Sequence, residues 1–346
     1  PSLATASLVT MEDESARVRR ELRSRGFAIV RQLLPPTAIE RARKHLETAV
    51  ERHLGQQLAE GKLQHTWPDL PLEERMVQAY AGNMEAAPCS WVPQVRTSFV
   101  FQQLLFRDPS LCALVSELTA GRPAEVASRF NCRCKLPDTS GAAFPWHQDH
   151  AFFRMQYLLK KQAPKRLLAA WAPLVTVDAS NGGVEYAVGS HLHGFRKHRR
   201  EGGFLTMAQD ALSELRGELP TLEPGDVLLF TDLTLHRSGV NLAPTARWSA
   251  DWAYELLDSD DICPPLEAVL QAEENGGTHE QAEVVEEKET AKTVDGAVEV
   301  IEASAESKTT AGSWVDDERL RVALLAVVVA AAATIAAVTL YRPRLR

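Results

Sequence analysis

The chain has 346 residues, 45% of them hydrophobic, and carries a formal net charge of −8 at pH 7. The length allows one large domain with additional segments, and the acidic balance argues against a nucleic-acid-binding surface. The five cysteines include no CxxC pair and the chain has no Asn-x-Ser/Thr acceptor, which favours a cytosolic domain with ordinary buried thiols. We recognise no secretory signal in the N-terminal sequence.

The first part of the chain predicts helices around a single strand. A short helix is expected to begin in residues 18–22 and to end at Arg25-Gly26, and residues 27–30 predict a strand. Pro35-Pro36-Thr37 then opens a strongly periodic helix that continues to Val50. Another helix is expected over residues 111–118, within a segment whose pattern is otherwise mixed.

Residues 126–254 have the pattern of a mainly β domain. Short apolar runs alternate with turns rich in Gly, Pro, Asn and Asp, which indicates a barrel or a double-sheet jelly roll. For example, the turn Glu223-Pro224-Gly225-Asp226 precedes the apolar run 227–230, which predicts a buried strand.

The most informative motif is Trp146-His147-Gln148-Asp149, followed much later by His236. A His-x-Asp pair with a distant His is the ligand set of the 2-His-1-carboxylate facial triad, which holds non-haem Fe(II) and leaves coordination positions open. A lone His-x-Asp is more often part of a surface loop. Here, however, both pieces adjoin apolar, strand-like runs, and a rigid sheet suits a site that must hold three ligands in one geometry.

After Cys263-Pro264-Pro265 the chain becomes acidic and poor in aromatic residues. Such a segment buries too little apolar surface to offset the entropy of ordering it, so residues 263–321 are expected to be a disordered, acidic linker. A charged helix over residues 281–291 is the alternative. Neither interpretation assigns catalysis to this segment.

Residues 322–340 form a run of nineteen residues without charge. At about 1.5 Å per residue a helix of this length spans roughly 28 Å, close to the hydrocarbon thickness of a bilayer. We therefore expect a transmembrane helix followed by the basic tail 341–346, with a buried core helix as the alternative. This layout predicts a C-terminal tail anchor that leaves the folded domain facing the cytosol, on a mitochondrial, peroxisomal, plastid or ER membrane.

Four stretches of the chain together resemble the phytanoyl-CoA dioxygenase (PhyH-like) family of Fe(II)/2-oxoglutarate-dependent oxygenases. They are Arg25-Gly26-Phe27-Ala28-Ile29-Val30-Arg31; Trp146-His147-Gln148-Asp149; Asn181-Gly182-Gly183-Val184-Glu185 through Val188-Gly189-Ser190-His191; and Pro224-Gly225-Asp226-Val227 through His236-Arg237-Ser238-Gly239-Val240-Asn241. The resemblance covers about residues 18–254. It implies a mainly β domain over residues 17–262, after an N-terminal tail of residues 1–16, with a double-stranded β-helix (jelly-roll, cupin-like) core and flanking N-terminal helices.

The same resemblance implies the ligands of the metal and of its co-substrate. His147, Asp149 and His236 correspond to the iron ligands. Arg247 corresponds to the arginine that receives the distal carboxylate of 2-oxoglutarate, a role that suits a guanidinium because it can form two parallel hydrogen bonds to a carboxylate. A surface arginine is the alternative for Arg247.

Three further residues, Lys135, Trp171 and Ser238, match positions that line the 2-oxoglutarate pocket in relatives. Arg133 is a rival to Lys135, because the alignment can slip at this place. For Trp171 the alternative is packing in the core, where large aromatic side chains usually lie. Phe152 is expected either against the substrate or in the core.

Other polar residues near these motifs are expected to have structural roles. Asn181-Gly182-Gly183 predicts a turn in which glycine adopts positive φ. His150 is expected to point away from the face that His147 and Asp149 share. His191, His193 and His198 lie among basic residues that would repel a cation, so we expect a solvated basic loop rather than a zinc site.

The resemblance implies an enzyme that uses Fe(II), 2-oxoglutarate and O2, with ascorbate as reductant, to hydroxylate an unactivated C–H bond of a small molecule and release succinate and CO2. Asp149 favours hydroxylation, because halogenating relatives have a small residue at its place. A lipid or acyl substrate is suggested by the predicted anchor. The alternatives are a membrane-tethered, non-catalytic binding protein that retains the fold, and a cupin-type zinc or manganese enzyme.

Overall fold

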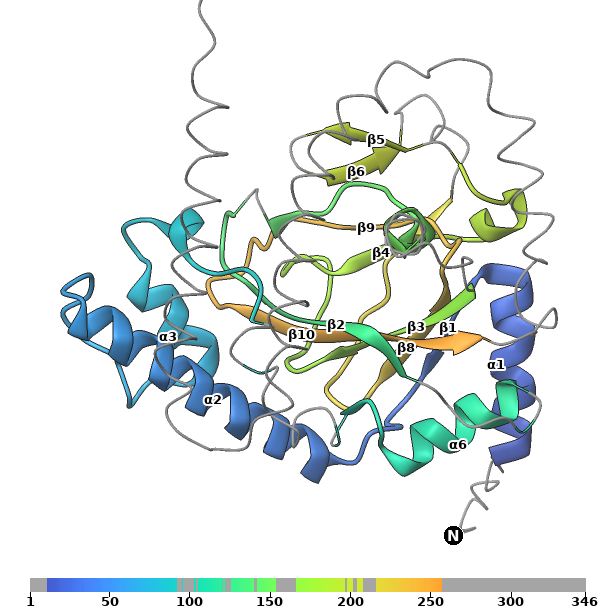
Figure 1. Ribbon diagram of the computed structural model, residues 1–346, viewed down its shortest axis with the longest axis horizontal. Helices are drawn as coiled ribbons and strands as arrows, with labels where there is room; N and C mark the ends of the chain where they lie inside the picture. Colours follow the sequence, from blue (N-terminus) through green and yellow to red (C-terminus); the bar gives the residue numbers. More distant parts are fainter. Residues whose placement is uncertain are drawn as a thin grey trace, which may run out of the picture. The chain divides into compact units, whose positions relative to one another are not determined.

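The centre of the fold is a five-stranded antiparallel sheet in the order β1-β8-β3-β10-β2 (Figure 1). The strands span Phe27–Val30 (β1), Val227–Thr231 (β8), Arg166–Pro173 (β3), Arg247–Leu256 (β10) and Val126–Lys135 (β2). β3 is buried along its whole length, because it lies in the middle of the sheet and both of its faces are covered.

A smaller sheet, in the order β7-β4-β9, packs against one face of the five-stranded sheet. It consists of Gly217–Glu218 (β7), Val184–Ala187 (β4) and His236–Ser238 (β9), and a separate hairpin pairs His198–Glu201 (β5) with Phe204–Met207 (β6). Apolar side chains from both sheets, among them Phe27, Trp171, Tyr186 and Phe230, form one buried cluster. Two antiparallel sheets that enclose a core fit the predicted cupin-like, double-stranded β-helix architecture.

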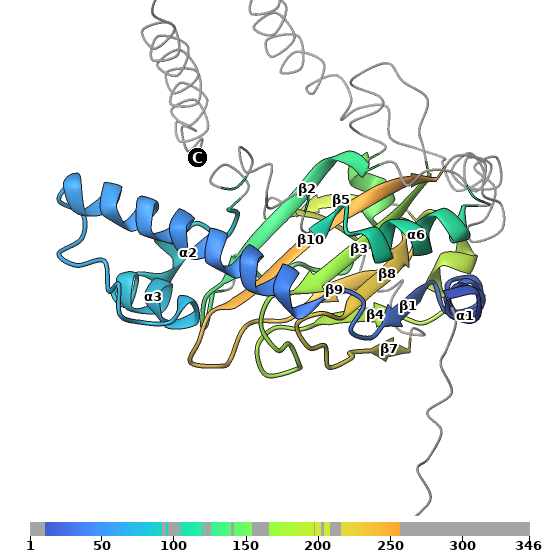
Figure 2. The same ribbon diagram turned by 90° about the horizontal axis from the view of Figure 1, so that it is seen from below.

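The helices cover the opposite face of the five-stranded sheet (Figures 1 and 2). They are Met11–Arg25 (α1), Pro36–Ala59 (α2), Leu72–Ala79 (α3) and Pro109–Leu118 (α6), with 3-10 turns at Met84–Ala86 (η1) and Ser190–His193 (η3). Leu22, Leu46 and Leu114 from these helices pack in one cluster with Leu229 and Trp248 of the sheet. Each fully buried leucine contributes about 1.5–3 kcal/mol to folding relative to an exposed one.

The alternation of side chains along the strands separates the helix-side core from the side on which the site lies. Cys132, Cys134 and Trp248 belong to the helix-side cluster. Their neighbours in the chain, such as Arg133 and Arg247, line a cavity on the other face. This division follows from the two-residue repeat of a strand, which sends successive side chains to opposite faces.

The computed structural model describes residues 11–91, 95, 103, 105–119, 121, 126–139, 142–153, 166–196, 198–201, 204–207 and 216–256. The predicted acidic linker 263–321, transmembrane helix 322–340 and basic tail 341–346 lie outside these residues. Within the described ranges, no helix combines the length and apolar character needed to cross a bilayer. Cys89, Cys112, Cys132 and Cys134 are free thiols, and Cys89 is exposed rather than buried.

The helices differ from the sequence prediction mainly in their lengths. α1 begins at Met11, so it crosses the predicted boundary between a tail at residue 16 and a domain at residue 17. Its first turn carries Glu12, Asp13 and Glu14, which interact favourably with the positive end of the helix dipole. α2 begins at Pro36, as predicted, and continues nine residues beyond Val50.

Candidate metal and co-substrate site

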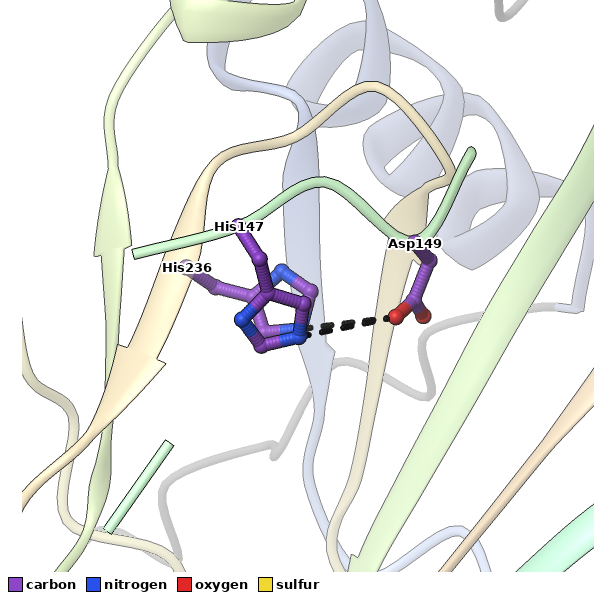
Figure 3. Close-up of side chains that lie close together, drawn as sticks. All are labelled: His147, Asp149 and His236. Carbon is purple, nitrogen blue, oxygen red and sulfur yellow. Dashed lines mark ion pairs between the residues drawn. The ribbon is translucent and has the colours of Figure 1, made fainter. Parts of the chain in front are cut away.

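His147, Asp149 and His236 converge at one point between the two sheets (Figure 3). Asp149 Oδ1 lies 3.7 Å from His147 Nε2 and 3.8 Å from His236 Nε2. The two histidines are held by the backbone, because His147 N donates to His236 O and His236 N donates to His147 O, each at 3.0 Å. The segment that contains the His-x-Asp motif is therefore paired directly with β9.

The three side chains fit a divalent metal. Their potential ligand atoms all lie within 4.8 Å of one another. Each imidazole Nδ1 contacts a backbone carbonyl, that of Pro145 for His147 and that of Thr234 for His236, which leaves both Nε2 atoms facing Asp149. Two imidazole nitrogens and one carboxylate are the donor set of a non-haem iron site.

Burial keeps both imidazoles uncharged. Burial, with the neighbouring His236 as a further cause, lowers the pKa of His147 to about 3. Burial also lowers the pKa of His236 to about 4. Neutral imidazole is the form that binds a metal, so both side chains are ready to do so at neutral pH.

A cavity adjoins the three residues and extends along the inner face of the five-stranded sheet. Its wall includes aromatic side chains and a smaller number of charged ones. Residues lining it are Asn131, Arg133, Phe144, His147, Asp149, Phe152, Phe153, Ala169, Trp171, Val184, Tyr186, Phe230, His236, Arg237, Ser238, Arg247, Asp251, Trp252 and Ala253. A mostly apolar cavity with a few convergent polar groups is typical of a small-molecule site.

Arg247 provides a buried positive charge in the wall of this cavity. Its side chain is only 3% exposed, and its Nη1 donates to Ser249 Oγ at 2.8 Å. The guanidinium lies 5.7 Å from the ring centroid of Trp171. Burial, followed by repulsion from Arg133, lowers the pKa of Arg247 to about 10. Arg247 forms no ion pair with a carboxylate among the described residues, and Asp251 acts on it only at longer range, so this buried cation is suited to an anionic ligand.

The remaining predicted pocket residues do not all reach the cavity. Trp171 and Ser238 line it, whereas Lys135 lies behind the wall and donates to Ser238 Oγ at 2.9 Å and to Gly239 O at 2.5 Å. Burial, with Arg247 and Arg133 as further causes, lowers the pKa of Lys135 to about 6. Its rival Arg133 does line the cavity and pairs with Asp251.

The family model "Phytanoyl-CoA dioxygenase (PhyH)" matches residues 22–249, which is more than half of the chain. The chain belongs to the phytanoyl-CoA dioxygenase family. It is therefore an enzyme, an Fe(II)- and 2-oxoglutarate-dependent dioxygenase, as the resemblance of its motifs predicts.

The individual proteins that match this PhyH-family chain have low sequence identity to it. It is 29% identical to the 1-deoxypentalenic acid 11-beta-hydroxylase of Streptomyces arenae over 217 residues, which are 58% of this chain and 71% of that protein. A solved α-ketoglutarate-dependent carbocyclase, SnoK from nogalamycin biosynthesis, matches with 18% identity over 71% of this chain and 85% of its own, at a TM-score of 0.47. EctD from S. alaskensis, solved with 2-oxoglutarate and 5-hydroxyectoine, matches with 18% identity over 75% of this chain and 80% of its own, at a TM-score of 0.46.

Two buried networks support the His-x-Asp segment of this PhyH-family site. The amide of Gln148 donates to the carbonyls of Gly194 and Leu233, and its oxygen accepts from Arg196 N. As predicted, His150 turns away from His147 and Asp149. Its Nδ1 lies 2.8 Å from Asp232, which also pairs with Arg166. Neither network was visible from the sequence, because both join segments that are distant along the chain.

The expectation of a solvated basic loop is wrong for two of the three histidines. His191 is buried and contacts Arg23 O, and His198 Nε2 accepts from Gln148 N. Only His193 is exposed. Within the described residues, the His147–Asp149–His236 group is the single cluster able to hold a metal. The predicted Asn181-Gly182-Gly183 turn is present, with φ of +78° at Gly182.

Proposed function

We propose that the protein hydroxylates an unactivated C–H bond of a small molecule and converts 2-oxoglutarate into succinate and CO2. The observation that carries this proposal is the position of buried Arg247 in the wall of the same cavity as the three convergent ligands. A metal-binding group and a buried cation in one cavity suit a ligand that chelates at one end and carries a carboxylate at the other.

In this proposal His147, Asp149 and His236 hold Fe(II). Bound iron supplies the activation of O2 that no side chain can provide. The chain contributes the geometry: β9 fixes His236, the Pro145 and Thr234 carbonyls orient the imidazoles, and the aromatic wall excludes water. Asp149 occupies a position that a halide would need, so we propose hydroxylation rather than halogenation.

We assign the co-substrate to the buried end of the cavity. Arg247 receives the distal carboxylate, Trp171 packs beside it, and Ser238 is a further polar contact in the wall. Lys135 holds the Ser238 hydroxyl from behind and adds positive charge once an anion is bound, because a nearby negative charge favours protonation of its amine.

We assign the substrate to the side of the cavity that carries Arg133, Phe144 and Phe152. Arg133 is 24% exposed, far more than Arg247, and its guanidinium lies 4.5 Å from the Phe144 ring centroid. Aromatic side chains suit an apolar lipid or acyl body, and Arg133 suits an acidic group on it. The name of the Streptomyces arenae relative, an acid hydroxylase, supports an acidic substrate.

We also propose that residues 322–340 anchor the enzyme in a membrane, with the catalytic domain facing the cytosol. The support is the run of nineteen uncharged residues, which is long enough to cross the bilayer as a helix. An anchored enzyme would meet membrane-associated substrates at raised local concentration.

The test is succinate formation by the purified protein with Fe(II), ascorbate and 2-oxoglutarate, against a panel of lipid, acyl and other small acids. We expect substrate-dependent succinate and a product that has gained one oxygen atom. Metabolite comparison between cells with the wild type and with His147→Ala extends the search. A His147→Ala protein with full biological activity would instead support a non-catalytic binding protein.

A further inference from the structure

Tyr186 lines the cavity that also contains the metal ligands and Arg247. It lies on β4 directly opposite His236 of β9, so the two side chains are on one face of the small sheet. Its ring stacks on the His236 imidazole, with centroids 5.6 Å apart and an angle of 19° between the planes. Phe27 and Phe230 hold the ring from other sides.

The hydroxyl of Tyr186 is buried without a hydrogen-bond partner among the described residues. Leaving a buried hydroxyl unpaired is unfavourable, and native proteins rarely do so without a reason. Packing alone does not explain the oxygen, because phenylalanine would fill the same space. Tyr186 is among the residues that line the cavity beside the three convergent ligands, so its buried hydroxyl lies close to the space that a ligand would fill.

Besides the Tyr186 hydroxyl, the cavity wall contains a second unpaired buried donor, which belongs to Arg247. Its Nε lacks a partner among the described residues, and the guanidinium lines the same cavity as Tyr186. The charged groups within electrostatic range of the Tyr186 hydroxyl are Asp149, Asp251 and Arg247. A phenol is a hydrogen-bond donor at neutral pH, as is a guanidinium. Two buried, unsatisfied donors in one cavity predict an anionic acceptor between them.

We propose that Tyr186 is a further 2-oxoglutarate-binding residue, whose hydroxyl donates a hydrogen bond to the distal carboxylate that Arg247 receives. This inference rests on the proposed function and adds a contact to it. Tyr186 then has two roles. Its stacked ring fixes the plane of the His236 imidazole, and its hydroxyl sets the depth at which the co-substrate is held.

The test is equilibrium binding of 2-oxoglutarate to protein loaded with Ni(II), which occupies such a site without supporting turnover. Tyr186→Phe removes one oxygen atom and keeps the ring. Hydrogen bonds to charged groups are strong, so we expect the dissociation constant to rise about tenfold. Tyr254→Phe is the matched control: it removes a buried hydroxyl that donates to Phe106 O, and should leave binding unchanged.

A second ligand separates a direct contact from a change in shape. 2-Oxobutyrate keeps the chelating end of 2-oxoglutarate and lacks the distal carboxylate, so Tyr186→Phe should leave its affinity unchanged. Thermal unfolding without co-substrate provides a further readout. Since the variant removes an unpaired buried oxygen, its unfolding temperature should equal or exceed that of the wild type, whereas a structural hydrogen bond would make it fall.

Three outcomes overturn the inference: equal affinity of Tyr186→Phe and wild type for 2-oxoglutarate, an equal loss for both ligands, or a lower unfolding temperature of the free variant. Failure of the proposed function looks different. In that case the Ni(II)-loaded wild type itself would not bind 2-oxoglutarate, so there would be no affinity for the substitution to reduce.

Discussion

The two histidines of the triad differ from exposed histidines in the pH range over which they can bind metal. Their lowered pKa values, about 3 for His147 and about 4 for His236, keep both imidazoles neutral well below the ordinary value of about 6.5. A lowered pKa shifts proton competition to more acidic pH. We therefore expect the affinity for Ni(II) to stay nearly constant from pH 7 to pH 5.

This prediction is checked by titrating the protein with Ni(II) at several pH values, with circular dichroism to confirm that it stays folded. Ordinary imidazole ligands would lose affinity steadily below about pH 6.5, by up to tenfold per pH unit for each histidine. A loss of that size between pH 6.5 and pH 5 would contradict the burial argument.

Arg247 is predicted to act on the co-substrate rather than on folding. Replacement by lysine keeps the charge and removes the planar, two-pronged donor, so the KM for 2-oxoglutarate should rise about tenfold or more while metal binding is retained. Steady-state kinetics across 2-oxoglutarate concentrations measures this. Arg199→Lys, at an exposed ion pair, is the control. An unchanged KM for 2-oxoglutarate would show that Arg247 does not bind the co-substrate.

The site residues that belong to a sequence motif could be predicted from the sequence. Those that strand pairing brings into the site could not. His147, Asp149, His236 and Arg247 occur at recognisable positions in the chain. Tyr186 becomes part of the site only because β4 pairs with β9 in one register, and a shift of one residue would send it to the other face. Such a register is decided by tertiary packing, which no local pattern contains.

Asp232 couples three elements through one buried carboxylate. It follows β8, accepts from Arg166 at the start of β3, and contacts His150 beside the His-x-Asp motif. Arg166 and His150 outweigh the effect of burial and lower the pKa of Asp232 to about 2, so it is charged at neutral pH. Removing one partner of a buried ion pair leaves the other charge uncompensated.

Asp232→Ala is therefore expected to lower the free energy of unfolding by about 3 kcal/mol or more. Denaturant unfolding followed by circular dichroism measures the change. Glu201→Ala, which breaks an exposed ion pair with Arg199, should cost less than about 1 kcal/mol. Equal effects of the two substitutions would show that the Asp232 network contributes no special stability.

Elements with strong local signals were predicted well from the sequence. α2 has a proline start and a clear apolar period, and β8 follows a Pro-Gly-Asp turn, so both begin where the pattern indicates. α3 has only eight residues, too few for the period to be distinguished from the mixed composition around it. Strand order was not predictable, because β1 pairs with β8 across some two hundred residues.

On the scale of the whole molecule, catalysis and membrane attachment are predicted to be separable. The metal ligands and Arg247 all lie between residues 147 and 247, and the proposed anchor is residues 322–340. Deleting residues 322–346 should release the protein from membranes and leave the turnover of a soluble substrate within about twofold of the full chain. Fractionation and succinate assays measure the two properties. An equal distribution of both forms between membrane and supernatant would contradict the anchor.

The central claim is that His147, Asp149 and His236 together hold the iron on which the chemistry depends. The most direct measurement is anaerobic titration with Fe(II) of the wild type, Asp149→Ala and Asp251→Ala, the last being a carboxylate in the same cavity outside the triad. We predict one tightly bound Fe(II) per chain in the wild type and in Asp251→Ala, and a large loss of affinity in Asp149→Ala. Unchanged Fe(II) binding in Asp149→Ala would contradict the account.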